Sequence, residues 1–188
     1  MKSGSGEPIK LGTGNYILRS LEESDATQRY LNWLKDPEVV RYLNAQHATP
    51  SIDGIQHYIR RHDNVTSFHV GIFSLPEENH VGNFSFYLDI PSEVVNINVL
   101  VGEREFWGKQ VVTETRAAIL DFLFDDLGAH KVWGSPWANN HAAIFNYKKQ
   151  GFNMEAILRD HKRDASGDRI AVIHFSILKE EWTGRRSG

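Results

Sequence analysis

Alternation of apolar and polar residues predicts a half-buried strand in the middle of the chain, over residues 95–101. One face of this strand carries Val95, Ile97, Val99 and Val101, and the other carries Asn96 and Asn98. From residue 111 the period becomes helical, with an apolar stripe of Val111, Val112, Thr115, Ala118, Ile119, Phe122 and Leu123. The opposite, polar side of this helix carries Glu114, Arg116, Asp121 and Asp125. A glycine-containing turn joins the two elements, so the free N–H groups and the dipole at the helix start form a potential anion site.

The same two periodicities predict the remaining elements. Further strands are expected at 15–20, 67–75, 80–90, 131–135, 154–161 and 169–178. Helices are expected at 22–34, 38–43, 52–61, 111–126 and 140–149, with Ser24 and Ser51 as N-caps of the first and third. This order favours a single α+β domain over residues 15–182, built on a mixed, mostly antiparallel central sheet flanked by helices. Residues 1–14 and 183–188 are expected to be flexible ends.

Composition narrows the function classes. The 188 residues carry a net charge of −3, which argues against a broad nucleic-acid surface. The absence of cysteine excludes disulfides, a thiol nucleophile and a thiolate metal site, and no metal is expected. No apolar run has the length of a membrane span, and the N-terminus lacks a signal-peptide core, so we expect a cytoplasmic protein without a membrane partner.

Two stretches taken together, residues 96–126 and 140–152, resemble the GCN5-related N-acetyltransferase (GNAT) superfamily. The matching positions are Trp107-Gly108-Lys109, Thr113-Glu114, Asn140, Ala143, Tyr147, Lys149 and Gly151-Phe152. The likeness is closest to the ribosomal-protein and amino-sugar N-acetyltransferases, and residues 33–43 resemble the substrate-side helices of that branch. The resemblance implies a GNAT-like domain in which two splayed strands form the cleft for the acyl-CoA.

The resemblance also implies acetyl-CoA as the co-substrate and a set of residues that bind it. The strand end would hydrogen-bond the pantetheine arm, and the loop and helix start would hold the phosphates. The expected cofactor-binding residues are Leu100, Val101, Trp107, Gly108, Lys109, Gln110, Val111, Val112, Thr113 and Asn140. For Asn140 an alternative is a plain helix N-cap, since Asn is favoured at that position.

Two catalytic positions follow from the same resemblance. Tyr147 matches the tyrosine that protonates the leaving thiolate in many members, although its position also suits a packing role. The general base of many members is a Glu on the strand face where Asn96 and Asn98 fall here, so Asn98 occupies a catalytic position without being able to take a proton. A water or another segment would then supply the base, and candidates by position are Asp89, Glu103, His69 and His47.

The loop departs from the family pattern, which has a basic or amide residue, then glycines or other small residues, where this chain has Glu105, Gln110 and Val112. The leading hypothesis is an acyl-CoA-dependent N-acetyltransferase acting on a primary amine of a small molecule, first of all a nucleotide-linked amino sugar. The alternatives are acetylation of a protein N-terminus, as in the ribosomal-protein enzymes, and a non-catalytic binding or regulatory protein on the same fold. A monomer or a homodimer is expected.

Overall fold

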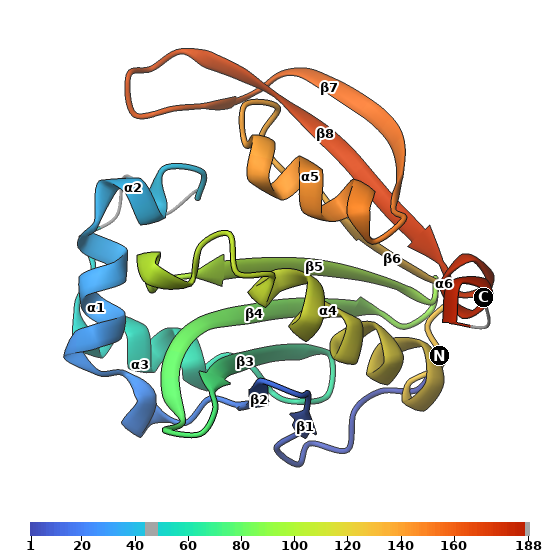
Figure 1. The fold of residues 1–188 in the computed structure, drawn as a ribbon, viewed down its shortest axis with the longest axis horizontal. Coiled ribbons are helices and arrows are strands. Elements are labelled where there is room, and N and C mark those ends of the chain that lie inside the picture. The colour runs from blue at the N-terminus through green and yellow to red at the C-terminus, as the bar shows by residue number, and fades with distance from the viewer. Residues whose placement is uncertain (44–48, 187–188) are drawn as a thin grey trace.

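One open sheet of eight strands organises the computed structural model, which describes residues 1–43 and 49–186 (Figure 1). The strand order is β1-β2-β3-β4-β5-β6-β8-β7, and every neighbouring pair is antiparallel except β5 and β6. The strands are β1 (Lys10–Gly12), β2 (Tyr16–Ser20), β3 (Ser67–Ser74), β4 (Asn79–Asp89), β5 (Val94–Val101), β6 (Lys131–Gly134), β7 (Asn153–Arg163) and β8 (Arg169–Leu178). The prediction of a mixed, mostly antiparallel sheet is confirmed.

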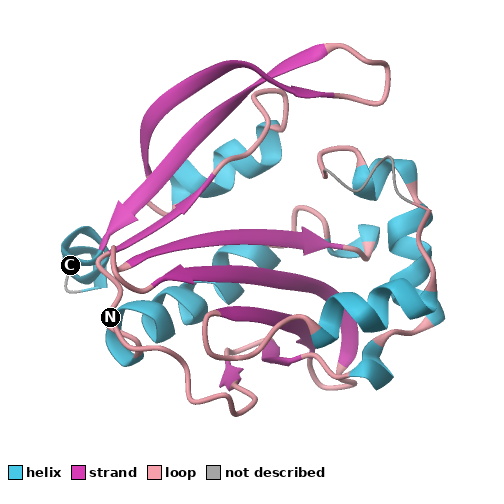
Figure 2. Ribbon diagram, turned by 180° about the vertical axis from the view of Figure 1, so that it is seen from behind, coloured by secondary structure: helices cyan, strands magenta, loops and turns pink. Residues whose placement is uncertain are grey.

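Helices cover both faces of this sheet (Figure 2). The α-helices are α1 (Gln28–Lys35), α2 (Pro37–Val40), α3 (Ile52–Arg60), α4 (Val111–Asp121), α5 (His141–Lys149) and α6 (Lys179–Arg186). Short 3-10 turns are η1 (Glu23–Asp25) and η3 (Arg104–Phe106), and η4 (Phe122–Asp126) extends α4 as a π-helical turn. No helix within residues 1–43 and 49–186 has the length and hydropathy needed to cross a membrane.

The predicted helix over residues 22–34 begins too early. Arg19 donates two hydrogen bonds to the carboxylate of Asp25, at 2.7 and 2.8 Å, and this carboxylate also accepts from the backbone N–H of Glu22. These contacts close the separate turn η1, and α1 starts at Gln28 with the Thr27 hydroxyl as its N-cap, so Ser24 is not the cap. The helix expected at 38–43 is likewise shorter and ends at Val40.

Both ends of the chain take part in regular structure. Lys10–Gly12 forms β1, which pairs with β2, and the N–H of Lys2 donates to the carbonyl of Leu127 at 2.6 Å. At the other end, α6 continues past the expected domain boundary at residue 182. The side chains of Met1 and Trp182 both pack against the main core. The sequence pattern placed residues 1–14 and 183–188 outside the domain, whereas the structure includes Lys10–Gly12 in the sheet and residues 183–186 in α6.

Two hydrophobic clusters lie on the two faces of the sheet. The larger cluster places α4 against the centre of the sheet and includes Phe68, Phe84, Phe86, Ile119 and Leu123. The smaller cluster places α1 and α3 against the other face and includes Leu21, Tyr30, Trp33, Ile55 and Ile59. Strand β4 is therefore buried on both faces along most of its length, which fixes its partner β5 in the middle of the molecule.

We expect Gly82→Ala to destabilise the sheet beside β5. A Cβ atom at Gly82 would lie 2.4 Å from the carbonyl oxygen of Leu100, so the two strands would have to move apart. Overpacking of this kind costs about 1–3 kcal/mol in the free energy of unfolding, which urea denaturation measures. The control is Gly12→Ala in β1, where an added Cβ has no heavy atom within 4 Å. Equal midpoints for the two variants would show that β4 and β5 separate without cost.

Candidate active site

Strands β5 and β6 pair over a short distance and then part. Their parallel register covers only Val94–Asn96 with Lys131–Trp133, whereas β5 runs on to Val101 and β6 ends at Gly134. The edge of β5 from Ile97 onward therefore lacks a strand partner on this side. A cleft of about 1180 Å³, called the main cleft below, opens at this point between β5, the start of α4, α5 and the β7–β8 hairpin. The predicted splay of two strands is confirmed.

The loop and the start of α4 lie at the end of this free strand edge. No side chain caps the helix, so the N–H groups of Val111, Val112 and Thr113 lack acceptors within it. Gln110 precedes them in a left-handed backbone conformation, with φ of 60°, and Gly108 also has a positive φ, of 76°. The Gln110 side chain accepts a hydrogen bond from Lys149 Nζ at 3.0 Å. Gln110 thus adopts the conformation for which glycine is favoured, and its amide is tied to α5.

Trp107 fastens this loop to the strand. Its indole N–H donates to the carbonyl oxygen of Val101 at 2.9 Å, although the side chain as a whole is 43% exposed. The guanidinium of Arg104 lies 5.5 Å from the Trp107 ring centroid and 3.6 Å from the Asp36 carboxylate. Trp107, Gly108, Gln110, Val111, Val112 and Thr113 all line the main cleft, together with Leu100 and Val101, whereas Lys109 stands over the Phe106 ring.

Positive charge dominates the main cleft. Among its described lining residues are the cations Arg41, Arg116, Lys149 and Lys162. The one acidic residue of that described lining, Glu38, lies 4.0 Å from Arg41 and is partly neutralised by it. This balance favours an anionic ligand in the cleft, because field lines from cations add up where the walls exclude water.

Asn140 is the N-cap of α5. Its Oδ1 accepts a hydrogen bond from the backbone N–H of Ala143 at 3.1 Å, so the structure shows the capping role that the sequence left open as an alternative. Asn140 also lines the main cleft. With the oxygen engaged as a cap, the side-chain NH₂ is the group left to donate to a ligand.

Tyr147 lies on α5 with its hydroxyl at the point where β5 and β6 part. The side chain is buried, and its ring stacks on Phe175 at a centroid distance of 5.3 Å. The hydroxyl is directed toward Gly134, since a Cβ atom built there would lie only 1.9 Å from it. Burial raises the pKa of the Tyr147 hydroxyl, and a hydrogen bond and the positive charge of Arg116 act in the opposite direction.

Arg116 is a site residue that the sequence pattern misplaced. It was expected on the polar face of α4, yet it is 1% exposed because α5 packs over it. Its Nε donates to Gln150 Oε1 at 2.5 Å, and its guanidinium stands 4.3 Å from the Tyr147 ring centroid. Its Nη2 has no hydrogen-bond partner among the described residues. A buried, incompletely paired cation beside the cleft stabilises negative charge on its neighbours, the Tyr147 oxygen first of all.

A second pocket of about 690 Å³, the side pocket, lies on the other side of β5 and reaches α3. Asn98 lines both cavities, donates to Asn96 Oδ1 at 2.8 Å and lies opposite Ser85 in the β4–β5 register. Ser85 Oγ in turn lies 2.8 Å from His69 Nδ1 and 3.3 Å from the Tyr58 hydroxyl. The described lining of the side pocket contains no Asp, Glu, Lys or Arg. It is a neutral surface of hydroxyl, amide and aromatic groups.

The candidate general bases lie in different places. His69 is buried in the side pocket, where burial lowers its pKa to about 3. Glu103 accepts from the Trp33 indole at 3.0 Å, and Asp89 lies at the far end of β4, so neither carboxylate lines either cavity. His47 is outside the described residues.

Comparisons with known proteins agree with this geometry. A family model for an acetyltransferase (GNAT) domain matches residues 15–153. An uncharacterized N-acetyltransferase, p20, of Bacillus licheniformis is 28% identical over 93% of this chain and 98% of its own length. The chain superposes on spermidine N-acetyltransferase from Vibrio cholerae with a TM-score of 0.80 at 20% identity, covering 89% of this chain and 98% of that one. For the ribosomal-protein-S5-alanine acetyltransferase of Vibrio fischeri the TM-score is 0.77 at 15% identity, covering 93% and 98%.

The family model spans both sides of the splay, from β2 through the loop and α4 to the end of α5. The solved structures share the fold over nearly the whole chain. Acetyl transfer to an amine from acetyl-CoA is the activity of this group of proteins. The chain belongs to the GNAT family and is an N-acetyltransferase.

Proposed function

We propose that this protein transfers the acetyl group of acetyl-CoA to the primary amine of a small hydroxylated molecule, with amino sugars, free or nucleotide-linked, as the first acceptor class. The proposal that acetyl-CoA is the donor rests on the free edge of β5. This edge ends at the start of α4, where no side chain caps the helix. An extended amide-containing chain can add to that edge as a strand would, and phosphates can bind the N–H groups at the helix start. The cations of the main cleft favour the same anionic donor.

The acceptor half of the proposal rests on the side pocket. A sugar presents hydroxyl groups and apolar ring faces, and the side pocket offers Ser85, Tyr58, Tyr87 and Asn98 beside aromatic surface. A polyamine carries several positive charges and would require carboxylates, which the described lining of this pocket lacks. A neutral acceptor is therefore favoured over the polyamine substrate class.

Acetyl-CoA supplies an activated thioester, and the residues of the chain bind it and manage protons. Backbone N–H groups along β5 polarise the carbonyl oxygen, and closure between β5 and α5 limits access of water. Tyr147 protonates the leaving thiolate, and Arg116 stabilises the phenolate that results. These roles are proposals that follow from the placement of the side chains around the splay.

Calorimetric titration with acetyl-CoA, followed by thiol release over an amine panel, tests the proposal. The panel contains amino sugars, nucleotide-linked amino sugars, peptides with free N-termini, and spermidine. We expect acetyl-CoA binding and turnover of at least one amino sugar. Turnover confined to peptide N-termini or to spermidine would refute the acceptor class, and a folded protein that does not bind acetyl-CoA would refute the donor.

A non-catalytic role on the same fold is the second candidate, favoured by Gln110 and Val112 in the phosphate loop. We expect Gln110→Gly with Val112→Ala to tighten acetyl-CoA binding, measured by calorimetry. Gln110 precedes the helix with positive φ, so the penalty of about 1 kcal/mol for Gly inside a helix does not apply, and relief of left-handed strain favours the variant. Unchanged or weaker binding would show that the loop already fits its ligand.

The control for this variant is Lys149→Met, which removes the hydrogen bond between Lys149 and Gln110 together with one of the cations of the main cleft. Tighter binding by Lys149→Met, despite the lost positive charge, would attribute the effect to release of the Gln110 side chain and not to its bulk. Thermal unfolding of both variants reports whether the loop change alters stability.

A further inference from the structure

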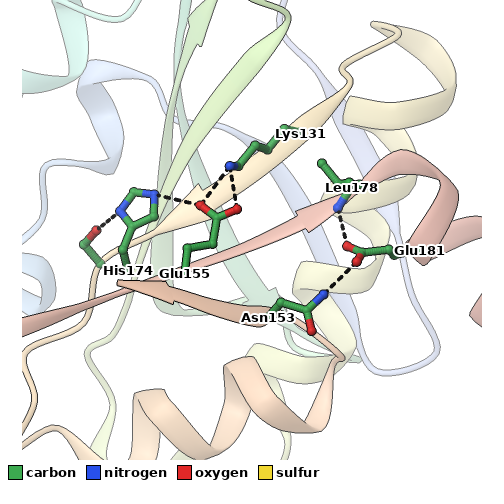
Figure 3. Close-up of polar contacts among 7 residues, drawn as sticks. Lys131, Asn153, Glu155, His174, Leu178 and Glu181 are labelled. Atoms are coloured by element: carbon green, nitrogen blue, oxygen red, sulfur yellow. Dashed lines mark hydrogen bonds and ion pairs between the residues drawn. The ribbon is translucent and has the colours of Figure 1, made fainter. Parts of the chain in front are cut away.

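A polar cluster on and beside strands β6, β7 and β8 reaches the main cleft through Trp133, Ser135 and His174. Figure 3 shows the contacts of its Lys131, Glu155 and His174 side chains. The ring of His174 on β8 lies between Ser135 and Glu155, with 3.0 Å from Nδ1 to Ser135 Oγ and 3.7 Å from Nε2 to Glu155 Oε2. The same ring stacks on Trp133 at a centroid distance of 4.6 Å. Lys131 Nζ donates to both oxygens of Glu155, at 2.7 and 2.8 Å. Ser135, Glu155 and Trp133 thus hold the His174 imidazole at the wall of the cleft, and Lys131 holds Glu155 in place.

Strand register places this cluster at the splay. Trp133 is opposite Asn96 of β5, and Ser135 lies two residues further along the chain, directly after the end of β6 and beyond the point where the strands part. Alternation puts Ser135 on the same sheet face as Trp133, whereas Tyr147 approaches Gly134 from the opposite face. Ser135 and His174 both line the main cleft. The Ser135–His174 pair and Tyr147 can both transfer protons, and they therefore lie on opposite faces of the sheet at the splay.

The partners of His174 select its tautomer. The Lys131 ammonium keeps the pKa of Glu155 below its ordinary value, so the carboxylate is ionised at neutral pH. A carboxylate near Nε2 favours the tautomer that carries the proton on that nitrogen. Nδ1 is then the nitrogen with a lone pair, and it accepts the hydrogen bond from the Ser135 hydroxyl.

We propose that Ser135 and His174 form the route by which the acceptor amine loses its proton, with Glu155 as a positioning residue. The inference rests on the proposed function and supplies the base that Asn96 and Asn98 cannot provide. As the N–C bond forms and the C–S bond breaks, the amine proton passes to Ser135 Oγ, and the Ser135 proton passes to His174 Nδ1. Tyr147 gives its proton to the thiolate, and His174 and Tyr147 return to their resting states by exchange with solvent.

The charges around His174 suit this role. Burial lowers the pKa of His174, and among its charged neighbours Glu155 on β7 raises it and Lys131 on β6 lowers it. His161 and Lys162 of β7 line the same cleft. Because the ordinary histidine pKa is about 6.5, the ring is neutral at pH 7 and free to accept a proton. His69 differs, because burial lowers its pKa to about 3 and it lines the side pocket and not the main cleft.

The test compares the wild-type enzyme with His174→Gln, Ser135→Ala and Glu155→Gln, and with His57→Gln as a matched control on the exposed side of α3. We expect kcat of His174→Gln to fall by about 10²-fold or more, with less than a twofold change, roughly, in the Kd of acetyl-CoA. Wild-type kcat/KM should decline as pH falls through the His174 pKa, below about 6.5, because the protonated ring cannot act as a base. His174→Gln should lack this decline, and His57→Gln should behave as the wild type.

Nuclear magnetic resonance titration of the wild-type imidazoles gives a readout independent of turnover. We expect the pKa of His174 to match the acidic limb of the rate profile, and Glu155→Gln to move both to lower pH, which a merely structural role of Glu155 would not do. An active wild type whose His174→Gln variant keeps more than about a tenth of kcat at every pH would overturn the inference alone. A wild type that binds no acetyl-CoA would overturn the proposed function, and the inference with it.

Discussion

Tyr147→Phe is expected to lower kcat by about 10²–10⁴-fold, the usual contribution of a general acid, while leaving the affinity for acetyl-CoA nearly unchanged. The substitution removes only the hydroxyl, and the ring keeps its stacking on Phe175 and its edge contact with Phe152. Steady-state kinetics with the acceptor found in the amine panel give kcat, and calorimetry gives the Kd of acetyl-CoA.

The same substitution should also lower stability, because the Tyr147 hydroxyl is a polar neighbour of the buried guanidinium of Arg116, whose Nη2 has no hydrogen-bond partner among the described residues. Loss of a polar neighbour from a buried charged group costs about 1–3 kcal/mol, which corresponds to roughly 2–4 °C in Tm for each kcal/mol in a chain of this size. Tyr16→Phe is the control, a buried tyrosine that lines neither cavity. If the Tyr147→Phe variant has the kcat of the wild type and a lower Tm, Tyr147 has a structural role and no catalytic one.

Local patterns predicted the parts of this fold that depend on neighbours in sequence. The alternation over residues 95–101 gave β5 with Val95 and Ile97 buried and Asn98 exposed, as the structure has it. The loop and the start of α4 followed at the expected positions. The position of α1 was wrong, because it depends on the carboxylate of Asp25, which Arg19 of β2 and the backbone of Glu22 hold in a turn of its own.

The site residues that the sequence missed are those assembled from distant segments. Arg116 faces away from the apolar stripe of its own helix, and only the packing of α5 with Gln150 buries it. Ser135 directly follows β6, and Glu155 and His174 lie on β7 and β8; these strands meet through the order β6-β8-β7, in which chain order and spatial order differ. No spacing in the sequence signals such a cluster, since the register of a hairpin is fixed by its bulges and turn.

Gly134→Ala should have the largest effect on the site as a whole. A Cβ atom at this position would lie 1.9 Å from the Tyr147 hydroxyl oxygen, 2.8 Å from its Cζ and 3.0 Å from the Ile97 carbonyl oxygen. The Tyr147 ring cannot slide away freely, because it lies nearly parallel to Phe175, at an angle of 2°. We expect a loss of about 1–3 kcal/mol in the free energy of unfolding from overpacking, and a fall in kcat at least as large as that of Tyr147→Phe.

A double-mutant cycle tests whether this effect runs through the hydroxyl. In Gly134→Ala with Tyr147→Phe the 1.9 Å contact is absent and the contact with Cζ, at 2.8 Å, remains, so part of the lost stability should return. Residues in contact show coupling energies of about 0.5–3 kcal/mol, and we expect a value in that range. The double variant should lose less stability than the sum of the losses of the two single variants. Urea denaturation of the four proteins in the cycle measures it. If the stability losses of the two single variants simply added up, Tyr147 would be able to move aside at no cost. The close approach of α5 to β6 would then not determine the direction of the Tyr147 hydroxyl.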